Sequence, residues 1–175
     1  IIKITYANTP EWKCLINDKE FINAKAKADE LLLNGKNLDA IKKYEKAVTL
    51  YPDEESLKTL IKEYNNIKDY ENELACINKL LWYHPGKRNA LFVYRASILN
   101  KKQHNYLKAV YFGEDFRNYF SENVNNLITL SDSYRLIKDY SKAEEILLIA
   151  EGLDKDNSYL PKVRKLLEKE ITKNV

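Results

Sequence analysis

One tetrapeptide occurs twice in this chain, and its spacing limits what the chain can fold into. Ile67-Lys68-Asp69-Tyr70 recurs as Ile137-Lys138-Asp139-Tyr140, 70 residues later, each time just before an amphipathic stretch. Seventy residues is two periods of about 35, and a period in the range of about 20 to 50 residues is typical of repeat proteins. The spacing therefore predicts a helical repeat array, a scaffold whose sequence specifies architecture more than chemistry.

Helical periodicity runs through most of the chain. From Asp18 onward apolar residues recur with the period of an amphipathic helix, and breakers interrupt them at regular intervals. The 175 residues include only 4 Gly and 4 Pro, too few for the many turns of an all-β fold. Cutting at the breakers predicts eight helices of about 11 to 16 residues and a ninth over 159–172. Because the loops are short, neighbouring helices should be antiparallel, and the predicted fold is an all-α solenoid of helical hairpins.

The beginning of the chain follows a different pattern. Residues 1–6 alternate like a short strand, and Thr9-Pro10-Glu11 reads as the capped start of a short helix in which Trp12 would cover the first hairpin. The chain begins at Ile1 and contains no methionine. We therefore expect residues 1–20 to be an N-terminal extension or the stub of an upstream segment.

Small side chains recur at matched positions of the predicted hairpins. In the first helices the matched residues are separated by 33, 36 and 34 positions, and three of the four are small: Ala28, Ile61, Ser97 and Ser131. In the second helices the matched residues are Ala40, Glu73, Ala109 and Ala143. Two helices reach the short end of the usual separation of about 8 to 10 Å only where no large side chain stands between them. These two ladders predict close packing inside each hairpin.

This pattern resembles the tetratricopeptide repeat, a unit of about 34 residues made of helix, turn and helix. The best-matching stretch contains Ala28, Leu31, Ala40, Ile41, Tyr44, Ala47 and Pro52. The resemblance implies a right-handed superhelix of four repeats, at 21–53, 54–88, 89–123 and 124–157, followed by a capping helix and tail at 158–175. Three residues depart from the pattern: Lys27, Glu73 and Gly113, the last standing where an aromatic residue is usual.

In tetratricopeptide arrays the first helices of successive hairpins line a concave groove that commonly binds a peptide, so the resemblance implies a non-enzymatic protein-interaction scaffold. By position, the groove would be lined by Lys25, Asp29, Leu32, Lys58, Lys62, Asn65, Tyr94, Arg95, Ile98, Lys101, Asp132 and Arg135. Six of these twelve residues are cationic and two are acidic. We therefore expect an acidic or C-terminal peptide, with Tyr94 and Asn65 adding directional hydrogen bonds; a solvated lysine-rich face is the alternative. Ala26 and Thr59 replace the asparagines of chaperone-binding repeats, which argues against a chaperone partner.

No residue pattern in the chain points to catalysis, a metal or a cofactor. The two histidines, His84 and His104, have no sequence neighbours that form a recognised catalytic or metal-binding arrangement. His84 lies at a predicted helix end, where an imidazole near the last carbonyls is the simpler explanation. The four glycines are scattered singly, so no phosphate-binding loop is expected. The sequence therefore predicts a protein that is not an enzyme and has no cofactor or metal site.

The charge balance leaves other classes of function open. The net charge of +3 comes from 29 basic and 26 acidic residues, a mixed surface that does not demand nucleic acid. Some helical-hairpin repeats bind single-stranded RNA through basic and aromatic side chains, so RNA binding is the alternative function. A regulatory or docking domain of a larger protein is a further alternative.

Aromatic residues gather in the second helix of the third predicted repeat. They are Tyr106, Tyr111, Phe112, Phe116, Tyr119 and Phe120. Phe112, Phe116 and Tyr119 share one helical face, which predicts packing in the core. Tyr111 falls off that face, and its exposure would indicate a second contact surface or a homo-oligomer interface.

The compartment is only weakly indicated. No apolar run reaches the length of about 18 residues that a membrane span needs. Cys14 and Cys76 lack CxxC spacing and are too few for a disulfide framework, which favours a reducing compartment such as the cytoplasm. An exported form stays an alternative, because the chain begins without a methionine.

Overall fold

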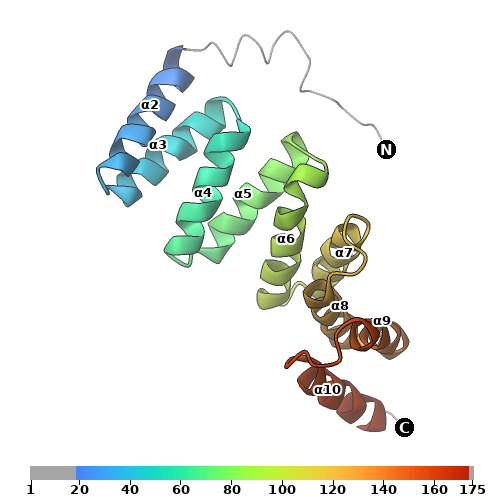
Figure 1. The fold of residues 1–175 in the computed structure, drawn as a ribbon. Coiled ribbons are helices and arrows are strands. Elements are labelled where there is room, and N and C mark those ends of the chain that lie inside the picture. Colours follow the sequence, from blue (N-terminus) through green and yellow to red (C-terminus); the bar gives the residue numbers. More distant parts are fainter. Residues whose placement is uncertain (1–18, 174–175) are drawn as a thin grey trace. The chain divides into compact units, whose positions relative to one another are not determined.

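The computed structural model describes residues 19–173 (Figure 1). Within that range the chain forms nine α-helices and one short 3-10 helix, η2 (Lys87–Asn89), and no strand. The α-helices are α2 (Lys19–Leu33), α3 (Asn37–Leu50), α4 (Glu54–Asn66), α5 (Tyr70–Tyr83), α6 (Ala90–Lys102), α7 (Tyr106–Arg117), α8 (Val124–Leu136), α9 (Tyr140–Leu153) and α10 (Leu160–Lys173). The predictions of an all-α fold and of nine helices are confirmed for these residues. The expectations for the strand-like stretch 1–6, for Thr9-Pro10-Glu11 and for Trp12 lie outside the described residues.

Helical hairpins are the building unit of the fold. The chain divides after Gly86 into two compact units. In the first unit α2 packs on α3, α4 on α5 and α3 on α4; in the second α6 packs on α7, α8 on α9 and α7 on α8, while α10 contacts α8 and α9. Figure 1 shows the paired helices of each hairpin running antiparallel. The helices that open the last three predicted repeats begin at Glu54, Ala90 and Val124, while the repeat boundaries and the hand of the superhelix stay predictions.

The repeated tetrapeptide forms the turn inside two of the hairpins. Lys68 and Lys138 have φ angles of 61° and 67°, the left-handed conformation that commonly ends a helix. The next residues, Asp69 and Asp139, cap the following helices. Their carboxylates accept hydrogen bonds from backbone N–H groups in the first turns of α5 and α9, at 3.2 and 3.1 Å. One tetrapeptide thus ends one helix and begins the next, which explains why it recurs at a multiple of the repeat length.

The two ladders of matched residues lie buried between the paired helices. All eight positions are at most 5 % exposed, so the prediction of close packing inside each hairpin is confirmed. The Ser97 hydroxyl donates a hydrogen bond to the Ala109 carbonyl at 2.8 Å, and the Ser131 hydroxyl donates to the Ala143 carbonyl at 2.7 Å. Each bond joins the two matched positions of one hairpin, so these buried hydroxyls are satisfied without keeping the helices apart.

Gly113 departs from the repeat pattern because α8 approaches it closely. A Cβ atom on Gly113 would lie 2.9 Å from Leu130 Cδ1 and 3.4 Å from Ser97 Oγ. Leu130 is fully buried, so it has little room to move aside. The Gly113 carbonyl also accepts a hydrogen bond from Asn126 Nδ2 at 3.0 Å. Side chains from α8 therefore fill the space beside Gly113, where the resemblance implied an aromatic side chain.

Tyrosine hydroxyls join neighbouring hairpins at equivalent places in the two units. Tyr64 donates to Glu45 between α4 and α3, and Tyr134 donates to Glu114 between α8 and α7 at 2.9 Å. Burial, followed by this hydrogen bond, raises the pKa of Tyr134 to about 12. The same two causes raise the pKa of Tyr64. Both phenols therefore stay protonated donors at neutral pH.

Candidate peptide-binding site

The predicted groove residues all lie on the first helices of the hairpins. They are Lys25, Asp29 and Leu32 on α2, Lys58, Lys62 and Asn65 on α4, Tyr94, Arg95, Ile98 and Lys101 on α6, and Asp132 and Arg135 on α8. The residues on α2 and α4 belong to the first unit, and those on α6 and α8 belong to the second.

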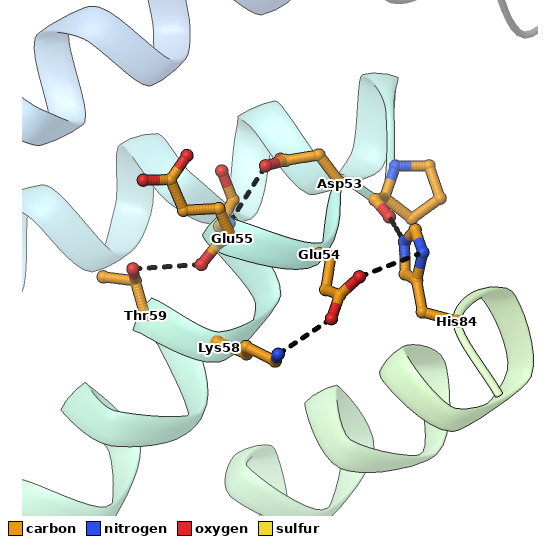
Figure 2. A network of polar contacts seen from close by, with 8 residues as sticks. Asp53, Glu54, Glu55, Lys58, Thr59 and His84 are labelled. Atoms are coloured by element: carbon orange, nitrogen blue, oxygen red, sulfur yellow. Dashed lines mark hydrogen bonds and ion pairs between the residues drawn. The ribbon is translucent and has the colours of Figure 1, made fainter. Parts of the chain in front are cut away.

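Acidic residues at the start of α4 neutralise two of the predicted groove cations. Lys25 Nζ lies 2.9 Å from Glu55 Oε2, an ion pair that joins α2 to α4. Lys58 Nζ lies 2.8 Å from Glu54 Oε1, and Figure 2 shows Glu54 between Lys58 and His84. This face is therefore less positive than its predicted groove residues alone imply, because Glu54 and Glu55 pair with two of the cations.

His84 ties the end of α5 to the loop between α3 and α4. Its Nε2 lies 2.8 Å from the Pro52 carbonyl oxygen, a contact between hairpins that the expectation of a bond to the last carbonyls of its own helix missed. Because a carbonyl oxygen only accepts, Nε2 carries the proton. Nδ1 lies 3.9 Å from Glu54 Oε2, a contact that Figure 2 marks with a dashed line. The Asp53 carboxylate in the same loop caps α4 by accepting a hydrogen bond from a backbone N–H at 3.0 Å.

Three further predicted groove residues of the first unit, Asp29, Lys62 and Asn65, differ in their contacts and exposure. The Asp29 carboxylate accepts a hydrogen bond from the Tyr44 hydroxyl of its own hairpin. Burial, followed by this hydrogen bond, raises the pKa of Tyr44. Lys62 and Asn65 are exposed. Lys62 forms no ion pair with any residue in the range 19–173, whereas the other two predicted groove cations of this unit, Lys25 and Lys58, each form one.

A pocket of about 460 Å³ lies between α6, α8 and α10 of the second unit. It is called here the α6–α8–α10 pocket, and its lining residues are Tyr94, Lys101, Asn125, Ile128, Thr129, Asp132, Tyr159, Lys162, Val163 and Leu166. Three of the predicted groove residues therefore lie on its wall: Tyr94, Lys101 and Asp132. Its volume falls within the range of about 300 to 1,000 Å³ that is usual for ligand pockets.

Charge in the α6–α8–α10 pocket is organised around Asp132. Arg135 Nη2 and Nε each lie 2.8 Å from Asp132 Oδ1, and Lys101 Nζ forms an ion pair with Asp132 Oδ2. Burial alone would raise the pKa of Asp132, but hydrogen bonds and charges from Lys101 and Arg135 outweigh it and hold that pKa below its usual value. Two cations thus share one carboxylate, which leaves this cluster with a net positive charge.

Helix α10 contributes one wall of this pocket, a role that its sequence pattern did not predict. Lys162, Val163 and Leu166 of α10 line the pocket, together with Tyr159, which immediately precedes the helix. The resemblance implied only a capping helix in this part of the chain. In the sequence, positions 162, 163 and 166 place one cationic and two apolar residues on one face of a helix. No other repeat has a matching face, so the repeat pattern did not mark these positions.

The aromatic cluster of α7 divides between core and surface. Phe116 is fully buried, as predicted, with its ring centroid 5.1 Å from that of Tyr94. Phe112 and Tyr119 are only half-buried. Tyr111 is 67 % exposed and Leu107, one turn earlier, is 74 % exposed. The position of Tyr111 off the core face is therefore confirmed.

In the part of the chain that the structure describes, no group of three or more His, Cys, Asp or Glu side chains is placed to hold a metal ion. None of the helices between residues 19 and 173 combines the length and the apolar character needed to cross a membrane.

Comparison with known proteins identifies the fold. No protein-family model matches the sequence, and no curated protein matches it. Among solved structures, YrrB, described as a TPR protein with an unusual peptide-binding site, matches with a TM-score of 0.71 and 13 % identity over 91 % of this chain and 82 % of its own. MamA from Desulfovibrio magneticus RS-1 matches with a TM-score of 0.63 and 17 % identity over 89 % of this chain and 93 % of its own.

A third match extends the same result. The TPR2B domain of yeast Sti1, solved in complex with pHsp70, has a TM-score of 0.56 and 18 % identity over 69 % of this chain and 97 % of its own. Identities this low establish a shared fold and leave function to be argued from the site. The chain has the tetratricopeptide repeat fold that the sequence resemblance predicted.

Proposed function

We propose that this chain is a non-enzymatic protein-interaction scaffold that binds an acidic partner peptide on the faces formed by the first helices of its hairpins. The observation that carries the proposal is the α6–α8–α10 pocket, whose wall includes Tyr94, Lys101 and Asp132. Concave sites with an apolar floor and a few polar groups are the usual form of a binding site. The peptide-binding site named for YrrB and the pHsp70 complex of Sti1 support the same function on this fold.

Charge supports an acidic peptide over other ligands. Lys62 on α4 has no ion-pair partner among residues 19–173, and the Asp132 cluster of α6 and α8 carries two cations for one carboxylate. Acidic side chains in these places gain charge-assisted hydrogen bonds. A solvated lysine-rich face, by contrast, would bind anions without preference for a peptide.

The test is selection from a random dodecapeptide library displayed on phage, with the full chain as bait. Selected peptides should be enriched in Asp and Glu, and a fluorescein-labelled selected peptide should bind more weakly as salt rises. For selected peptides that bind on α2 and α4, Lys62→Glu should weaken binding about three- to tenfold, because it reverses an exposed charge on that face. Lys43→Glu, an exposed lysine on the second helix of the first hairpin, is the matched control and should leave binding unchanged.

Two outcomes contradict the proposal. One is a library that yields no peptide, or peptides without an acidic preference. The other is retention of single-stranded poly(U) RNA that the selected peptides fail to displace, which would favour the RNA-binding class instead.

A further inference from the structure

The helix that closes the array is fixed firmly enough to form one wall of a binding site. Leu160 and Leu167 of α10 are buried in the core of the second unit. Arg164 forms two hydrogen bonds with the Glu151 carboxylate of α9, from Nε at 3.0 Å and from Nη2 at 2.6 Å. A bidentate pair of this kind sets both position and orientation. The face of α10 that carries residues 162, 163 and 166 is therefore held against the α6–α8–α10 pocket.

The floor of the pocket is apolar. Ile128 and Val163 are each 8 % exposed, and Leu166 beside them is half-buried. Tyr94 and Tyr159 add aromatic surface to the wall. A floor of aliphatic side chains bordered by tyrosines matches a bulky aliphatic or aromatic side chain, which gains free energy from leaving water.

The cations of the pocket differ in where they lie. Lys101 is held by Asp132, whereas Lys162 at the rim is exposed and forms no ion pair with any residue between 19 and 173. The exposed ammonium group of Lys162 can form an ion pair with an acidic side chain of a peptide, next to the residue that enters the pocket. A buried chain terminus would instead need buried donors at the floor, where the side chains are apolar.

We infer that the α6–α8–α10 pocket is the anchor site for an internal peptide segment in which a bulky apolar side chain lies next to Asp or Glu, and that Lys162 selects the acidic residue. This inference rests on the proposed function and adds the side-chain chemistry of the partner. It also makes α10 part of the binding site, in addition to its role in covering the core.

The test uses a selected dodecapeptide, acetylated and amidated at its ends, in fluorescence polarisation with the full chain. Lys162→Glu should weaken its binding about tenfold or more, which is the effect of losing one charge-assisted hydrogen bond. Thr129→Trp, which fills the pocket from α8, should weaken it at least as much. The matched control is Lys165→Glu, an exposed lysine on α10 that does not line the pocket, and it should leave affinity unchanged. Replacing the apolar residue of the peptide by Ala, or its Asp by Asn, should also weaken binding about tenfold.

Each alternative result has a definite meaning. Binding that responds to Lys62→Glu but not to Lys162→Glu or Thr129→Trp overturns the assignment of the pocket and leaves the proposed function standing. Binding that requires a free peptide C-terminus overturns the internal segment. A library without binders overturns both. Circular dichroism reports whether each variant folds, and Lys162→Gln, which removes the charge without reversing it, replaces Lys162→Glu if that chain is unfolded.

Discussion

At the scale of single residues, one backbone angle recurs in all four hairpin turns. Gly35, Lys68, His104 and Lys138 have φ angles between 61° and 71°, and they are spaced by 33, 36 and 34 residues, like the buried ladders. The left-handed conformation costs a residue with a Cβ atom about 1–2 kcal/mol. Glycine avoids that cost but loses about 0.5–1 kcal/mol more conformational entropy on folding. The turns therefore carry a small strain wherever the residue is not glycine.

Exchanging residues at two of these turns should shift stability in opposite directions. We expect Lys138→Gly to raise the free energy of unfolding by about 0.5–1 kcal/mol and Gly35→Ala to lower it by a similar amount. A Cβ atom at Gly35 would meet nothing within 4 Å, so the loss would come from the backbone alone. Lys138→Ala keeps the left-handed strain and removes the exposed side chain, so this control should leave stability unchanged. Urea unfolding measures all three, and shifts of the same sign for the two exchanges would contradict the explanation.

At the scale of helices, the repeat pattern and the structure predict opposite effects on stability for a substitution at Gly113. The matched residue of the fourth repeat is Leu147, so the pattern alone suggests that Gly113→Leu would improve the repeat. The structure predicts the opposite, a loss of about 1–3 kcal/mol, because the new side chain must displace the buried Leu130. Thermal unfolding followed by circular dichroism measures the change. Adding Leu130→Ala should recover part of the loss, and a Gly113→Leu chain as stable as the parent would argue against a close approach of α7 and α8.

The same helices show which parts of the structure the sequence period could predict and which it could not. A period reports positions that repeat, so it predicted the helices and the buried residues of the ladders, such as Ala28 and Ala143. Contacts made once, between side chains of different elements, leave no period in the sequence. Glu55 reaching Lys25 and Leu130 filling the space at Gly113 are contacts of this kind. The α10 wall of the pocket was missed for the same reason, because the capping helix has no counterpart in the other repeats.

At the scale of the whole molecule, we expect acid to destabilise one of the two compact units, the second, more directly than the other. Asp132 belongs to the second unit, and its side chain is 14 % exposed. Its ion pairs with Lys101 and Arg135 outweigh burial and hold its pKa below the ordinary value of 3.8. A carboxyl group whose pKa is lower in the folded chain than in the unfolded chain stabilises the fold above the unfolded value, and this stabilisation is lost as the pH falls through the folded value. The second unit should therefore lose stability as the pH falls below about 4.

Removing the carboxylate should act on that unit and change its pH dependence. At neutral pH, Asp132→Asn should lower the unfolding free energy of the second unit by about 1–3 kcal/mol, because Lys101 and Arg135 lose a charged acceptor. Below about pH 4 the difference from the parent should shrink, since the parent carboxylate is then protonated. Amide hydrogen exchange of α4 follows the first unit, and that of α8 follows the second. In repeat proteins each element is stabilised chiefly by its neighbours, so exchange should accelerate in α6 to α10 while exchange in α2 to α5 stays unchanged. Equal acceleration in α2 to α5 would mean that the whole chain unfolds as one cooperative block.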